Sequence, residues 1–237
     1  MQGLKLGEKR HAESLREICQ SPFFDVECGS SEYLGKEPSE LLPLSRHNSR
    51  WVGVVFDENL LECALRFTDM SARWETIGRG GSPRIRGEFN LLHLEEVLGQ
   101  PEGPAAFPGA TEFQRSFLSE LRVIDHTPRS GAGMLTYIRL QPGKSPLEIW
   151  YSDIADIGEE PYPPGFVKMD ITYCQYLDSL VVTKGTYGWQ YLYTDVSLRR
   201  GGFQETVDYL QGMLQVFPEL FPRYEYAPFR ARLEARL

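Results

Sequence analysis

Alternating and helical patterns of apolar residues divide the chain into short strands and helices. The clearest alternation lies in two runs, 134–140 and 147–152, which the turn sequence QPGKSP separates. In the second run Leu147, Ile149 and Tyr151 occupy every other position, as in a strand with two different faces. The two runs predict a β-hairpin.

Helices are predicted where apolar residues recur every three or four positions. In the most regular one, Phe113, Phe117 and Leu121 share one side, and Thr111 can cap the first turn. The segment Asn59–Phe67 fits either a short helix or a strand. Further helices or helical turns are predicted at 8–19, 38–42, 92–98, 170–184, 203–217 and from Pro228 onward.

The stretch Met169–Val196 is the densest in large apolar side chains, which predicts that it lies at the centre of the core. Asp170 is predicted to cap a helix that ends before Gly185. A strand is predicted to follow at 189–196. Aromatic residues at alternate positions would form one of its faces. Burial against helices is the simpler interpretation, and an exposed platform for stacking nucleotides is the alternative. These aromatic residues are Tyr187, Trp189, Tyr191 and Tyr193.

The order of these elements predicts an α+β fold, with a mixed or antiparallel sheet flanked by helices. Additional strands are predicted at 51–56, 74–77 and 85–92. The Pro- and Gly-rich segment 100–109 is the candidate boundary between an N-terminal part, 1–99, and a C-terminal part, 110–237. The two parts form either one domain or two tightly packed subdomains.

The composition is that of an ordinary globular protein, and the negative net charge argues against binding to nucleic acid. The chain has 237 residues, 41% of them hydrophobic, with a net charge of −8. Phosphate binding needs concentrated Lys and Arg, so a nucleic-acid partner is not expected, whereas a basic protein partner would fit. No window has the 18 or more apolar residues of a membrane span, and the first residues lack the apolar core of a signal peptide. A cytoplasmic location is predicted.

The four cysteines lack the spacing of a metal site. Cys19, Cys28, Cys63 and Cys174 are widely spread, with no C-x-x-C pair. Their even number permits two disulfides. Cys174, inside an apolar helical run, is predicted to be a buried free thiol. No metal or other cofactor is predicted.

Common catalytic motifs are missing from the sequence. His93 begins no H-E-x-x-H motif, and neither a P-loop nor a G-x-S-x-G elbow occurs. Asp125 and His126, near the predicted end of a helix, could supply a general base, but a solvent-facing helix end is the more common role. Arg79, Arg84 and Arg86 surround a glycine-rich loop and form a candidate anion site. With His126 they define the alternative function, a hydrolase or phosphate-handling enzyme.

An acidic segment beside aromatic residues supplies the leading candidate for a binding surface. The acidic balance of 151–170 fits a solvated loop, a metal site or a surface for a basic partner. We take the third interpretation as the hypothesis. The predicted partner-binding residues are Asp153, Asp156, Glu159, Glu160, Trp150, Tyr151 and Tyr162.

The order of elements from Met134 to Phe217 resembles the closing part of SMI1/KNR4-like (SUKH) proteins. In that comparison a strand pair and a helix precede GWQYLYTDV, and the helix FQETVDYLQGML follows. The resemblance implies an α+β fold and a non-enzymatic immunity protein that binds and blocks a toxin. It implies no catalytic residues. The leading hypothesis is therefore a protein-binding protein that occludes a basic toxin.

Overall fold

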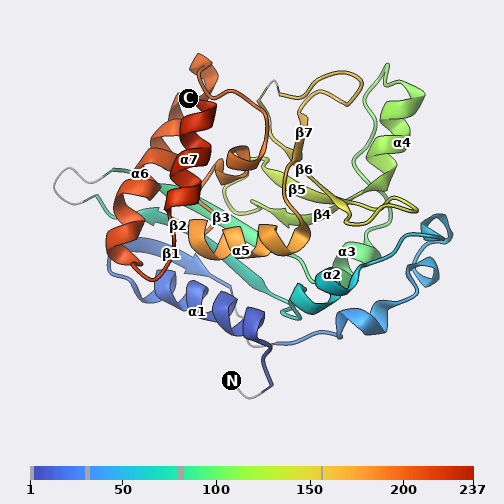
Figure 1. Ribbon diagram of the computed structural model, residues 1–237, viewed down its shortest axis with the longest axis horizontal. Coiled ribbons are helices and arrows are strands. Elements are labelled where there is room, and N and C mark those ends of the chain that lie inside the picture. The colour runs from blue at the N-terminus through green and yellow to red at the C-terminus, as the bar shows by residue number, and fades with distance from the viewer. Residues whose placement is uncertain (1–2, 30–32, 79–82, 156) are drawn as a thin grey trace.

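The computed structural model describes residues 3–29, 33–78, 83–155 and 157–237, and over these residues it contains one seven-stranded antiparallel sheet (Figure 1). Each strand pairs with the next one along the chain, so that the sheet is a meander. The predicted α+β fold is confirmed, with the antiparallel form of the sheet. The strands are β1 Phe24–Cys28, β2 Met70–Thr76, β3 Arg86–Leu91, β4 Leu121–His126, β5 Leu135–Arg139, β6 Glu148–Ser152 and β7 Phe166–Met169.

Helices come from both ends of the chain and from the connections between strands. Short 3-10 helices lie at Pro38–Leu41, Leu44–Arg46, Ser49–Trp51, Trp189–Tyr193 and Gly201–Phe203. The α-helices are α1 Leu6–Gln20, α2 Glu58–Cys63, α3 Leu94–Gly99, α4 Glu112–Glu120, α5 Tyr173–Thr183, α6 Gln204–Leu220 and α7 Ala227–Arg236.

One core joins the two parts of the chain that the sequence separates at 100–109. The sheet takes β1–β3 from the first part and β4–β7 from the second. Helices α1 and α5 contact each other where Ser14 Oγ donates a hydrogen bond to the Val181 carbonyl at 3.0 Å. The ring of Trp74 on β2 lies 5.8 Å from that of Phe217 on α6. The two parts therefore share one sheet and one apolar core.

Local sequence signals explain where several elements begin. Thr111 caps α4 by accepting a hydrogen bond from the Gln114 N–H, and the Gln114 side-chain oxygen accepts one from the Thr111 N–H, so both hydrogen bonds of the capping box are formed. Helix α5 begins with the same device at Thr172 and Gln175, and Asp170, which the sequence predicted as its cap, lies two residues before it. The β5–β6 hairpin is confirmed.

The face of the sheet that points away from the main apolar core is covered only in part, by helix α4. The Phe117 ring packs 4.6 Å from the Trp150 ring, and Leu118 and Tyr137 join this second apolar cluster. The cluster lies over β4–β7. Over β1–β3 the same face carries charged residues, and it is this uncovered area that holds the candidate site.

Two predicted strands are wrong. In the segment 51–56, Gly53 adopts a φ of +84° and makes a turn, so that Trp51 is buried while Val52 is 67% exposed. The segment 189–193 is a 3-10 helix whose five residues are all buried. A strand would divide these side chains between two faces, whereas here every one of them is buried, with Trp189 against Tyr176 of α5 and Tyr191 against Tyr151 of β6.

All four cysteines form disulfides, Cys19 with Cys28 and Cys63 with Cys174. The first links the end of α1 to the end of β1, and the second links α2 to α5. The prediction that Cys174 is a free thiol is wrong, because Cys174 is bonded to Cys63. The sequence alone does not show that α2 lies beside the beginning of α5.

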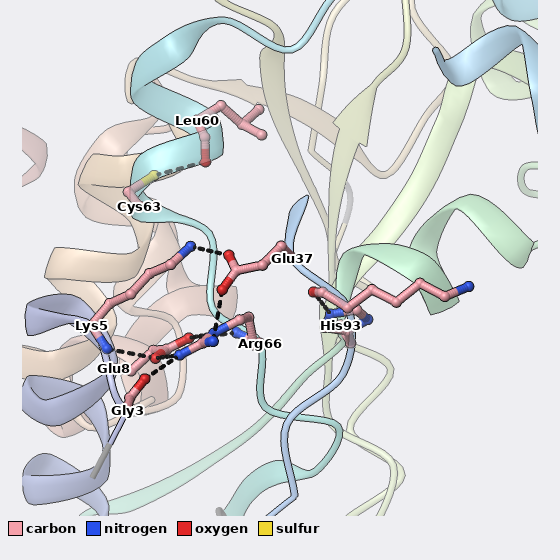
Figure 2. A network of polar contacts seen from close by, with 9 residues as sticks. Gly3, Lys5, Glu8, Glu37, Leu60, Cys63, Arg66 and His93 are labelled. Atoms are coloured by element: carbon pink, nitrogen blue, oxygen red, sulfur yellow. Dashed lines mark hydrogen bonds and ion pairs between the residues drawn. The ribbon is translucent and has the colours of Figure 1, made fainter. Parts of the chain in front are cut away.

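An ion-pair network fixes the beginning of α1 against the segment that follows α2 (Figure 2). Arg66 donates to both carboxylate oxygens of Glu8, at 2.7 Å each, and to Glu37 at 2.7 Å. The backbone N–H of Lys5 also donates to Glu8, which is fully buried. Burial acts to raise the pKa of Glu8, but these hydrogen bonds outweigh it and lower the pKa below its ordinary value.

Candidate functional site

A cleft of about 530 Å³ lies on the uncovered face of β1–β3. Its floor is made by strand residues, and its walls come from the segment 129–134, the segment 153–154, Tyr187 and the beginning of α6. Such a volume is within the range of roughly 300–1,000 Å³ that holds small ligands or single side chains of a partner. The charged residues that line it are Asp25, Glu27, Arg73, Glu75, Arg86, Arg129, Asp153 and Glu205.

Strand alternation places the charges of the floor on one face. On β1, Asp25 and Glu27 point to the side opposite the buried Phe24. The register sets Asp25 opposite Glu75, and it sets Glu27 opposite Arg73. The floor therefore contains one pair of like charges side by side and one pair of opposite charges.

The arginines of the floor are already engaged. Arg73 pairs with Glu27 at 3.4 Å, and Arg86 pairs with Glu75 at 3.2 Å. Arg84 also binds Glu75, at 3.1 Å, and its hydrogen bond is the main reason that the pKa of Glu75 is lowered. These contacts are exposed to solvent, where an ion pair contributes about 0–1 kcal/mol.

Buried Glu88 holds one wall of the cleft in place. It accepts hydrogen bonds from the backbone N–H groups of Arg129 at 2.6 Å and Ser130 at 3.0 Å, and from the Tyr187 hydroxyl at 3.2 Å. The Arg129 guanidinium is thereby positioned over β1, where it donates to the Glu27 carbonyl at 2.7 Å. A buried carboxylate with three donors fixes this wall before any ligand arrives.

The chain reaches Tyr187 through a left-handed turn at the end of α5. Lys184 has a φ of +56° and Gly185 a φ of +70°. Gly185 then accepts a hydrogen bond from the Glu88 N–H, and the Tyr187 N–H donates to the Arg86 carbonyl, both at 2.9 Å. This short pairing beside β3 brings Tyr187 to the polar face.

The opposite wall is the first turns of α6. The Tyr209 hydroxyl donates to Glu205, and its ring lies 6.1 Å from that of Tyr187, edge to face. Burial, then Glu205, raises the pKa of Tyr209 to about 12. Burial acts to lower the pKa of Arg86, but the neighbouring Tyr209, Glu75 and Glu205 outweigh it, so that the pKa lies above its ordinary value. Tyr209 therefore stays protonated and Arg86 stays charged at neutral pH.

Two of the residues predicted to bind a partner are core residues. Trp150 is 1% exposed and Tyr151 is fully buried, on opposite faces of β6. The prediction is wrong for both, because the alternation of β6 places each face against an apolar cluster. Asp153 accepts hydrogen bonds from the hydroxyls of Tyr151 at 3.2 Å and Tyr191 at 2.9 Å, and it lines the cleft.

The rest of the predicted acidic surface lies on the segment between β6 and β7. Glu159 and Glu160 are exposed. Tyr162 is half-buried, with its ring 5.5 Å from that of Phe113, which is 42% exposed. Ile154, at the rim of the cleft, is 88% exposed. Asp156 is outside the described residues. We call Ile154, Glu159, Glu160, Tyr162 and Phe113 together the loop surface.

Of the residues of the alternative enzyme site, the structure describes Arg84, Arg86 and His126. Arg84 and Arg86 both bind Glu75, and Arg79 is outside the described residues. His126 ends the strand β4 rather than a helix, so the predicted place for a general base is wrong. Its Nε2 contacts Asn90 Nδ2 at 2.7 Å, and burial lowers its pKa. Among the residues that the structure describes, no group of three or more His, Cys, Asp and Glu is placed to hold a metal ion.

Sequence reasoning missed Asp25, Glu27 and Glu205. The run FDVEC did contain a signal, because Asp25 and Glu27 alternate with Phe24, Val26 and Cys28 as in a strand with one polar face. Glu205 offered no such signal. It reaches the cleft only because α6 begins beside Tyr187 in the folded chain.

Comparisons of the chain with protein families, with curated proteins and with solved structures found no match. The resemblance to SUKH proteins stays a prediction. Over the described ranges, no helix is long and apolar enough to cross a membrane.

Proposed function

We propose that this chain is a non-enzymatic protein-binding protein that occludes a basic partner, and that the partner is a toxin, as for an immunity protein of the SUKH kind. The observation that carries the proposal is the loop surface. It combines exposed apolar side chains, Ile154 and Phe113, with the exposed carboxylates of Glu159 and Glu160.

This mixture has the composition of a protein interface. Apolar and aromatic side chains supply most of the binding free energy, and surrounding charges steer the approach of a partner of opposite sign. The Tyr162 ring is held by Phe113 and by Phe117, whose ring centroid is 5.2 Å away. Binding would therefore not need to order the Tyr162 ring, which reduces its entropic cost.

The compartment is also part of the proposal. The sequence predicts a cytoplasmic protein, but disulfides persist in oxidising compartments and are rare in the reducing cytosol. With four cysteines in two disulfides, an oxidising compartment is the better place to search for the partner.

The test is affinity purification of the tagged protein from its native cells, followed by mass spectrometry after a moderate salt wash. We expect one stoichiometric basic protein, whose capture falls at least tenfold for the variant Glu159→Lys/Glu160→Lys. Asp153 is left intact because its hydrogen bonds from Tyr151 and Tyr191 make it structural as well. Glu219→Lys, an exposed site on α6 that does not line the cleft, is the matched control. Equal capture by all three proteins would refute the loop surface as the binding site.

A further inference from the structure

The carboxylates of the cleft outnumber its cations. Five acidic residues and three arginines line it, and each arginine is engaged with Glu27, Glu75 or Ser71. Within the described part of the chain, no Lys or Arg forms an ion pair with the other three carboxylates. These are Asp25, Asp153 and Glu205.

Asp25 lies beside charged neighbours but forms no ion pair of its own within the described part of the chain. It is exposed, and it lies directly opposite Glu75 in the β1–β2 register. Like charges directly opposite on neighbouring strands are destabilising. Glu75 forms ion pairs with Arg84 and Arg86 on the side of β2 away from β1, so neither arginine bonds Asp25. A cation that arrives from outside would give Asp25 an ion-pair partner.

The walls of the cleft are prepared for such a cation. Glu88 fixes Arg129 and Tyr187, and the Tyr209 hydroxyl fixes the Glu205 carboxylate by donating to it. The rings of Tyr187 and Tyr209 both line the cleft beside Glu205. Aromatic rings near carboxylates favour guanidinium and ammonium groups through cation–π contacts as well as charge.

We infer that the cleft receives arginine or lysine side chains from a basic segment of the partner, with Asp25 and Glu205 as the residues that bind them. This inference rests on the proposed function, and it extends the interface from the loop surface across Ile154 and Asp153 onto the open face of β1–β3. Charge complementarity selects the occupant, because the lining carboxylates exceed the arginines.

The first experiment titrates fluorescein-labelled octa-arginine into the intact protein by fluorescence anisotropy, with octa-glutamate as the comparison peptide. We expect saturable binding of octa-arginine that weakens with added salt, and no binding of octa-glutamate. Asp25→Asn and Glu205→Gln should each weaken octa-arginine binding by roughly 2- to 5-fold. Glu219→Gln, on the same helix as Glu205, should leave it unchanged. Equal affinities in all four proteins, or no binding of octa-arginine, would overturn the inference.

A second readout separates binding from structural damage. Because Arg84 and Arg86 already compensate the charge of Glu75, Asp25→Asn should change the melting temperature by less than about 1 °C while it weakens binding. A lower melting temperature together with weaker binding would indicate a structural role and count against the inference.

The captured partner distinguishes the two proposals. If capture depends on Glu159 and Glu160 but is unchanged in the Asp25→Asn/Glu205→Gln double variant, the cleft inference fails and the proposed function stands. If no protein is captured, the proposed function fails. Octa-arginine binding that is lost in the double variant would then still support the cleft as a cation site.

Discussion

Removal of the Cys63–Cys174 disulfide should cost this protein more stability than removal of the Cys19–Cys28 disulfide. A disulfide limits the entropy of the unfolded chain, and the effect grows with the length of the loop that it closes. For a separation of 111 residues the loop-closure relation gives about 4.8 kcal/mol at 25 °C. For a separation of 9 residues it gives about 2.6 kcal/mol. The difference of about 2 kcal/mol is the quantity to measure.

The assay is equilibrium unfolding in urea of the wild type and of two variants, Cys63→Ser/Cys174→Ser and Cys19→Ser/Cys28→Ser. Free energies should be compared rather than midpoints, because an unfolded chain without its cross-link expands and steepens the denaturant dependence. A chemical reductant should lower the stability of the wild type to below that of either variant. If the Cys63→Ser/Cys174→Ser variant is no less stable than the other, the loop-entropy reasoning is wrong for this fold.

Two further predictions concern buried carboxylates. Arg66→Met leaves Glu8 buried without its partner and should destabilise the protein by about 3–5 kcal/mol, and adding Glu8→Gln should recover part of the loss. A double-mutant cycle by urea unfolding measures this, and strictly additive losses would contradict it. For Asp125, burial raises the pKa from 3.8 to about 6, so the folded state holds the proton more tightly than the unfolded state. The stability from this group is present below the unfolded pKa of 3.8, and about 3 kcal/mol is lost as the pH rises through 6. Unfolding free energies of the wild type and of Asp125→Asn, measured at pH 4 and at pH 6.5, should therefore converge or cross over this range, and parallel values would count against the shift.

Local signals predicted those elements whose stability is also local. The capping box at Thr111 and Gln114 needs only four residues, and the helix α4 was predicted from Thr111 as its cap and from its apolar spacing. The β5–β6 hairpin was predicted from the alternation of apolar residues and from the turn sequence between its two strands. The prediction for the segment 189–193 is wrong because its alternating aromatic residues suit a strand, whereas burial of all five side chains by helix and strand neighbours favours a 3-10 helix. Aromatic density indicated the core there but not its geometry.

The candidate site was predicted less well, because it depends on which faces of the sheet are covered. Trp150 and Glu159 lie nine residues apart in one acidic and aromatic segment, yet α4 buries the first and leaves the second exposed. No local pattern states where α4 will lie. The same holds for Asp25, whose role follows from its pairing with Glu75 on a strand about 50 residues later.

The order of the sheet has a consequence for how the protein is made. Since every strand pairs with the one before it, the sheet can grow strand by strand as the chain leaves the ribosome, and the connection of about 40 residues from β1 to β2 closes at a higher entropic cost than the short β5–β6 turn. The core cannot be sealed in that order. The polypeptide that covers the first-made helix, α1, includes α5, which is synthesised more than 150 residues later. Until α5 arrives, the apolar side of the nascent strands stays open, and it is in this interval that the growing chain most needs protection from aggregation.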